Sequence, residues 1–259
     1  MRKQFKRGCA AVLLLLILLM SFAALYPGRG KPETVRNVHI EMQPIKIESA
    51  GDGGGAGEGA AYGDVEMPRF VSDTGKTTPA MDRLNREIDA LEEEIRELRE
   101  QQAEESEEAG EANSGTGVQL RSYVHDGSRY LQLTVLVSPA LSGEDAGETA
   151  QPYRLMTLAY DRQEDESILC RDALLLAGIG GDTLSINVNS AYVASGMPGA
   201  VEATDMQGFR LNEDGSVGRI YMQLRTREQD AELPEIKFYS YDPLHQSIRL
   251  LEASELEAE

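Results

Sequence analysis

VQLRSYVHDGSRYLQLTVLV, residues 118–137, is the stretch that decides the fold. Two strand-like runs, 118–124 and 130–137, flank the turn residues 125–128 (HDGS), which is typical of a β-hairpin. In the second run apolar residues recur at every second position, and such residues lie on one face of a strand. That face consists of Leu131, Leu133, Val135 and Val137. The stretch therefore predicts two antiparallel strands with one face against a core.

Three further hairpins and one helix are expected after this pair. A loop covers 138–152, and the hairpins pair 153–160 with 167–170, 209–211 with 217–225, and 236–241 with 247–251. Between the first two of these hairpins, Asp182 can cap a helix that runs to about Ser195. Its apolar face consists of Leu184, Val188 and Tyr192.

Upstream of the opening hairpin, residues 78–102 predict the longest helix. Thr78 can cap its N-terminus, and Pro79 suits the first helical position. Apolar residues recur at alternating spacings of three and four, as in the seam of a two-stranded coiled coil or of a helix lying on a sheet. They are Met81, Leu84, Ile88, Leu91, Ile95 and Leu98. Because this seam is short, we favour packing within the chain, and a homodimer joined through residues 81–98 is the alternative.

Glycine-rich and acidic stretches set the expected domain boundaries. Residues 27–64 contain SAGDGGGAGEGAAYG and are expected to form a flexible juxtamembrane tether. Within them, Val38, Ile40 and Met42 alternate with polar residues and could form a short strand, which Pro44 limits. The folded domain is then 65–251, interrupted by an acidic linker at 104–117 and followed by a tail at 252–259.

This order of elements predicts an α+β fold. We expect a largely antiparallel sheet with one long amphipathic helix and one shorter helix packed on it. A single N-terminal transmembrane helix should precede this domain.

Residues 1–26 indicate where the chain works. A basic head, 1–7, precedes the uncharged apolar run 8–26, which is close to the roughly 20 residues of a transmembrane helix. Since basic flanks stay in the cytoplasm, we expect a single-pass anchor in the lipid bilayer of the cell membrane, with the C-terminal domain outside. The alternative is a secretory signal cleaved near Ser21 and Ala23, which would make the protein secreted.

The net charge of the chain limits the classes of partner that it can bind. Lys+Arg 25 against Asp+Glu 44 gives a net charge of -19, and removing the four basic residues of the head takes the exported part to -23. Such a surface repels nucleic acid and anionic lipid, and it attracts cations. We therefore expect no nucleic-acid partner, and either a cationic extracytoplasmic protein or a wall-derived ligand. Solubility alone is the alternative explanation of the charge.

Cysteine content excludes a disulfide within the exported domain, because Cys9 lies in the apolar run and only Cys170 follows it. Cys170 lies between Leu169 and Arg171 in a strand-like run. We expect a buried, unreactive thiol there, with an intermolecular bridge or a nucleophile as alternatives.

Two motif-like stretches carry no ligand chemistry. Residues 75–77 (GKT) resemble the end of a phosphate-binding loop, but Phe70 stands where that loop needs a glycine. Residues 212–215 (NEDG) resemble part of a calcium loop, but Arg210 would be its first ligand. We interpret this second stretch as a hairpin turn.

The histidines and the remaining sequence motifs predict no enzymatic activity. His39, His125 and His245 are far apart in the sequence and form no metal-binding pair, and the chain has no Gly-x-Ser-x-Gly motif. We therefore expect no catalytic, cofactor-binding or metal-binding residues. A wall-polymer hydrolase with an unrecognised carboxylate pair is the alternative.

Several segments resemble a known family. Residues 66–70 (EMPRF) precede a helix with LNREI at 84–88, residues 160–174 contain Tyr-Asp, a turn, a strand and RDAL, and closing strands follow at 209–222 and 238–250. This order resembles the Gram-positive extracytoplasmic domains of the anti-sigma factor RsiV and of the peptidoglycan deacetylase PdaC, over residues 65–251. The resemblance implies a sensing or binding module, which in some members is associated with recognition of lysozyme, a cationic protein.

The chain departs from this family in two places. Residues 151–153 (QPY) stand where the family often has a Gly-Gly-Ala-His segment, so no role of that segment is carried over. The head, 1–7, is too short for the cytoplasmic domain with which an anti-sigma factor holds its sigma factor. We therefore expect a membrane-anchored extracytoplasmic binding or sensing module. A structural subunit of an envelope or spore-envelope assembly, joined through residues 81–98, is the alternative.

Overall fold

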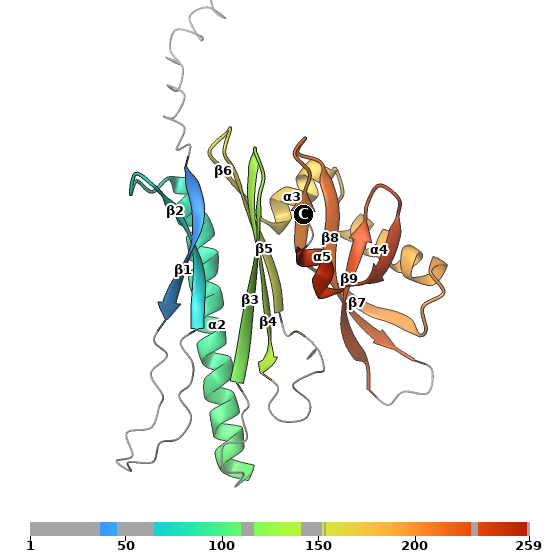
Figure 1. The fold of residues 1–259 in the computed structure, drawn as a ribbon. Coiled ribbons are helices and arrows are strands. Elements are labelled where there is room, and N and C mark those ends of the chain that lie inside the picture. The colour runs from blue at the N-terminus through green and yellow to red at the C-terminus, as the bar shows by residue number, and fades with distance from the viewer. Residues whose placement is uncertain are drawn as a thin grey trace, which may run out of the picture. The chain divides into compact units, whose positions relative to one another are not determined.

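The computed structural model describes residues 37–45, 65–109, 117–140, 152, 154–228 and 233–257 (Figure 1). All of them lie in one compact unit, Asn37–Glu259. The expected head and membrane anchor, 1–7 and 8–26, lie outside the described residues. Across the described ranges, no helix has both the length and the apolar character needed to cross a membrane.

The elements follow in this order: β1 (Val38–Ile45), β2 (Val65–Ser72), α2 (Pro79–Ala109), β3 (Gly117–Asp126), β4 (Tyr130–Ala140), β5 (Arg154–Asp161), β6 (Glu166–Ile168), α3 (Cys170–Ala177), α4 (Gly181–Ala194), β7 (Ala200–Leu211), β8 (Val217–Arg227), β9 (Glu235–Asp242), β10 (Ser247–Leu250) and α5 (Ala253–Glu257). All four predicted hairpins are present as the antiparallel pairs β3–β4, β5–β6, β7–β8 and β9–β10. The α+β class is confirmed.

The expectation of a single sheet is wrong, because the described strands form three antiparallel sheets. Their strand orders are β1-β2, which we call the N-terminal pair, β3-β4-β5-β6, the central sheet, and β10-β9-β8-β7, the C-terminal sheet. The physical reason lies in β4, which is buried at every position from 131 to 138. A strand buried on both faces needs a covering layer on each side of its sheet.

The two faces of the central sheet meet different partners. On one face, Gln132 of β4 bonds to the backbone of Leu211 in β7, and Leu136 packs with Tyr221 and Phe238 of the C-terminal sheet. The alternate residues of β4 point the other way and are at most 1% exposed: Leu131, Leu133, Val135 and Val137. Helix α2 lies against strands of this sheet and against β2. The central sheet is therefore a middle layer.

Helix α2 is the predicted long amphipathic helix. Thr78 caps it as expected, since Met81 N donates to Thr78 Oγ1 at 3.3 Å. Five of the six seam residues are at most 3% exposed, namely Met81, Leu84, Ile88, Leu91 and Ile95. The seam thus packs within the chain.

The prediction of an acidic linker at 104–117 is wrong in its bounds, because α2 continues to Ala109 and β3 begins at Gly117. Acidity suggested a solvated linker there, whereas Glu and Ala also favour helix.

Strand β1 corrects the expected tether at 27–64. It pairs along its whole length with β2, from Val38↔Ser72 to Ile45↔Val65. Its partner in the N-terminal pair is β2 alone, so Pro44 interrupts no second ladder. The folded part therefore starts at Val38 rather than at residue 65, and the rest of the expected tether, 27–36 and 46–64, lies outside the described residues.

Helix α3 corrects the strand that we expected to end at Cys170. Strand β6 ends at Ile168, and Cys170 is the first residue of α3. The Asp172 carboxylate accepts a hydrogen bond from Leu169 N at 3.1 Å, which caps the helix start. Gly178 ends the helix with φ 66, a left-handed conformation that glycine adopts without strain.

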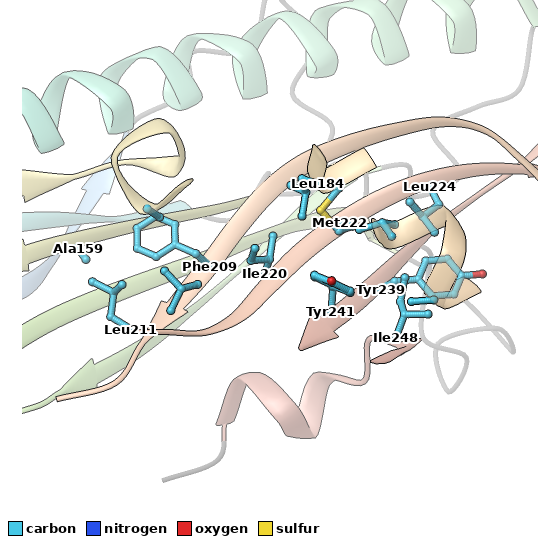
Figure 2. Packing of buried hydrophobic residues seen from close by; sticks show 14 of the residues in the cluster. Ala159, Leu184, Phe209, Leu211, Ile220, Met222, Leu224, Tyr239, Tyr241 and Ile248 are labelled. Carbon is cyan, nitrogen blue, oxygen red and sulfur yellow. The ribbon is translucent and has the colours of Figure 1, made fainter. Parts of the chain in front are cut away.

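The second half of the chain has its own apolar core. Helix α4 is the predicted shorter helix, and its buried residues Leu184, Val188 and Tyr192 pack on the C-terminal sheet together with Ala173 of α3. Figure 2 shows part of this core, with Leu184 beside Met222 of β8. Asp182 lies in the first turn of α4, and the cap position is Gly180.

The prediction of a tail at 252–259 also needs correction, because residues 253–257 form helix α5. Leu251 and Leu256 pack on the cluster formed by Tyr221 and Phe238 with the central sheet. An ion pair of 2.9 Å between Arg249 Nε and Glu255 Oε1 holds the short helix in place. Partial burial of these two leucines explains why the acidic sequence forms a helix here.

Candidate functional site

A hollow between the two four-stranded sheets is the first candidate site. It has a volume of ≈ 50 Å³ and is lined by residues of β3, β4, β7, β8 and α5, among them Tyr123, Gln132, Tyr221 and Leu256. Sites for small-molecule ligands measure about 300–1,000 Å³, and a hollow of this size holds a few waters at most. The hollow therefore has no room for a substrate.

The three histidines lie in separate elements. His39 of β1 lies 3.1 Å from Asp73, His125 of β3 lines the hollow, and His245 follows β9. Across the described ranges, no three His, Cys, Asp or Glu side chains are arranged to hold a metal ion.

Asp242 forms a carboxylate–histidine pair that has a structural role. Its Oδ1 accepts hydrogen bonds from the backbone N–H groups of Leu244 at 2.9 Å and His245 at 3.0 Å, and its Oδ2 lies 2.9 Å from His245 Nδ1. Burial opposes ionisation of Asp242, but the hydrogen bonds from His245 and the charge of Arg219 outweigh it and lower the pKa to about 2. The ionised carboxylate closes the β9–β10 turn, because it satisfies the backbone donors of that turn.

The Cys170 thiol is free and only partly accessible at the start of α3. Burial raises its pKa to about 11, and the nearby positive charge of Arg154 offsets only part of this effect. A nucleophilic cysteine needs a lowered pKa. The environment of Cys170 therefore fits the unreactive thiol that we expected.

We expect Cys170 to react slowly with iodoacetamide at pH 8. A pKa of about 11 leaves only about a thousandth of the thiol ionised, so alkylation should be on the order of a hundredfold slower than for an ordinary cysteine. The measurement is mass spectrometry of residues 37–259, in which Cys170 is the only cysteine. The same protein in urea is the control and should react at the ordinary rate. Fast labelling of the folded protein would identify an activated thiol instead.

A polar network joins three hairpin turns. Arg129 of the β3–β4 turn donates from Nε and Nη2 to Asp161 Oδ2, at 3.0 and 2.9 Å. The Glu213 carboxylate of the β7–β8 turn accepts from Ser128 Oγ at 2.5 Å and from Arg129 N at 3.0 Å. The Ser128 hydroxyl lowers the pKa of Glu213, which keeps it ionised. Arg129 and Asp161 balance each other's charge, and the hydrogen bonds accepted by Glu213 join the central sheet to the C-terminal sheet.

Arg162 extends this network to the N-terminal pair. Its guanidinium donates to Gly127 O and to Val38 O, the latter at 3.0 Å, and pairs with Asp126 at 2.5 Å. A Cβ at Gly127 would lie 1.8 Å from Glu213 Oε1, so a larger residue there would displace the Glu213 side chain. The sequence did not predict this network, since nothing local indicates which turns meet.

The outer face of α2 is the second candidate site. The helix carries twelve carboxylates and four arginines. Arg69 of β2 pairs with two of these carboxylates, Asp89 and Glu92, the latter at 2.9 Å. Further along the helix, Glu97 and Glu100 are exposed. This face presents an excess of negative charge to solvent while the seam stays buried.

Asn85 on the same helix explains one of the sequence motifs. Its side chain accepts from Phe70 N at 2.9 Å and donates to Phe70 O at 3.0 Å, so it holds β2 against α2. Both residues belong to the segments that carry the family resemblance.

Comparison with protein-family models, with curated proteins and with solved structures gives no match.

Proposed function

We propose that the chain is a membrane-anchored extracytoplasmic binding or sensing module of the cell envelope, without catalytic activity, that recognises a cationic protein. The observation that carries this proposal is the charge of α2, with twelve carboxylates against four arginines on a helix whose apolar seam is buried. A surface of one charge sign attracts partners of the opposite sign and accelerates their association. The acidic face of α2 is then the recognition surface.

Two further observations support a binding role over catalysis. The hollow between the sheets, ≈ 50 Å³, is too small for a substrate. The arginines at the hairpin turns are paired within the protein, Arg129 with Asp161 and Arg162 with Asp126. The resemblance over residues 65–251 to extracytoplasmic sensing domains agrees with this role, and the basic head with the apolar run 8–26 supports a place at the cell membrane.

Binding to lysozyme, used here as the cationic probe, should depend steeply on salt. We expect the affinity of the full chain to fall at least about tenfold between roughly 20 and 200 mM salt, because the Debye length shortens across this range. Titration calorimetry in a neutral detergent measures this. A flat salt response would contradict the electrostatic part of the proposal.

A pair of variants with equal net charge tests the location of the surface. Glu97→Gln with Glu100→Gln should weaken binding of the probe, since both carboxylates are exposed on α2. The matched control is Glu228→Gln with Glu252→Gln, which removes two exposed carboxylates outside α2. Equal weakening by both pairs would show that only total charge matters and would remove α2 from the proposal.

A further inference from the structure

The segment that forms α3 and α4 differs in charge from the rest of this acidic chain. Residues 170–194, which form the two helices, contain three charged residues, Arg171, Asp172 and Asp182, with a net charge of -1, although the chain is 27% charged with a net charge of -19. The two helices are consecutive, with α3 ending at Ala177 and α4 beginning at Gly181, and both pack on the C-terminal sheet (Figure 1). We call the exposed residues of these two helices the α3–α4 surface.

Large apolar side chains are exposed on the α3–α4 surface. On α3, Leu175 is 73% and Leu176 is 52% exposed, and on α4, Ile186 is 65% and Val193 is 68% exposed. Scattered exposed leucines are ordinary on soluble proteins. Here four large side chains are exposed on two successive helices that carry few charges, and a grouping of this kind marks an interaction surface.

The outer face of α4 has a spacing that suits pairing with itself. Ile186, Ser190 and Val193 stand at positions i, i+4 and i+7, so they share one face of the helix. In an antiparallel pair about a two-fold axis near Ser190, Ile186 would meet the partner's Val193, and the small serines would meet at the centre. Such a symmetric contact uses the same surface on both copies.

We propose that the α3–α4 surface binds a second copy of this chain. Two acidic molecules repel each other wherever their carboxylates approach, and this surface lets them meet where the two helices of each copy carry a net charge of only -1. The buried seam of α2 is unavailable for such pairing, since Ile88 is 0% and Leu91 is 3% exposed. The proposed contact also includes Leu175 and Leu176 of α3, which are 73% and 52% exposed, because a stable interface buries about 800 Å² per partner.

Two other occupants fit this surface less well. A cationic protein finds only two carboxylates on α3 and α4, Asp172 and Asp182, and Asp172 is already paired with Arg83 at 3.1 Å. Helices that lie on membranes carry several Lys and Arg on their polar face, whereas α3 and α4 contain Arg171 alone. The proposal is independent of the cationic partner above, because it uses a different surface.

Disulfide cross-linking of the full chain tests the proposal. Cys9 and Cys170 are replaced by alanine, Ser190→Cys is introduced, and the protein is oxidised in a neutral detergent. We expect a covalent dimer on a non-reducing gel. Glu97→Cys in the same background is the matched control, because residue 97 is exposed on α2. Ile186→Asp or Val193→Asp, both at exposed positions, should then reduce the Ser190→Cys cross-link at least about tenfold.

Circular dichroism melting establishes that each variant is folded. Cross-linking of Ser190→Cys no faster than of Glu97→Cys would overturn the proposal, and so would a cross-link that neither aspartate variant reduces. A third outcome also overturns it: no cross-link, together with binding to phosphatidylcholine vesicles that Ile186→Asp abolishes. That result would assign the α3–α4 surface to the membrane.

Discussion

Replacing Ile88 by aspartate is expected to unfold the domain. Ile88 is 0% exposed at the centre of the α2 seam. Truncation of a buried isoleucine costs about 2–5 kcal/mol, and an unpaired charge at the same place costs more. Domains have a total stability of about 5–15 kcal/mol, so the change removes most or all of it. Urea unfolding of residues 37–259, followed by circular dichroism, should show no folded baseline at 25 °C.

Ala90→Asp is the matched control, because it places the same charge on an exposed position of the same helix. It should leave the free energy of unfolding within about 0.5 kcal/mol of the parent's value. If Ile88→Asp kept a cooperative transition with the parent's midpoint and only dissociated a dimer, the seam would be an intermolecular coiled coil. Residues 81–98 would then join two chains, as our alternative interpretation held.

The sequence predicted the elements better than their assembly. The α2 seam and the alternating residues of β4 follow the periods of helix and strand, so both elements could be predicted with their buried faces. The number of sheets could not be predicted, because the same strands would satisfy one sheet or several. That choice depends on what covers Gln132 and Thr134, two polar residues of β4 that are at most 9% exposed. Polar residues that alternate with apolar ones usually indicate a face exposed to solvent. Here Gln132 bonds instead to Leu211 of β7, and Thr134 bonds to Thr157 of β5.

The ends of some elements were also predicted wrongly, because local strand-like or acidic patterns did not decide them. The run from Ser167 to Cys170 is typical of a strand, but Asp172 caps a helix that begins at Cys170. Acidic composition identified charge as the main feature of the surface, but not that α2 carries so much of it. The neutral segment 173–201 could have been found from the sequence, since a stretch with one charge is unusual in a chain of this composition.

The second large effect is expected from Gln132→Leu. The Gln132 side chain donates from Nε2 to Leu211 O at 2.9 Å and accepts from Leu211 N at 2.7 Å, so it pairs with the edge strand β7 as a backbone would. Leucine of similar size leaves both groups of Leu211 buried without a partner. Each such group costs about 1–3 kcal/mol. We expect residues 37–259 to lose about 3 kcal/mol in urea unfolding.

Gln119→Leu is the control, since it makes the same change at an exposed position of the neighbouring strand β3. Hydrogen exchange separates a local from a global cause: the Leu211 amide should exchange faster in Gln132→Leu even after correction for the lower stability. An unchanged midpoint with an unchanged Leu211 amide would mean that the sheets are held without this pair. Close packing would then carry the contact by itself, because a Cβ on Gly208 would already lie 2.4 Å from Thr157 Oγ1.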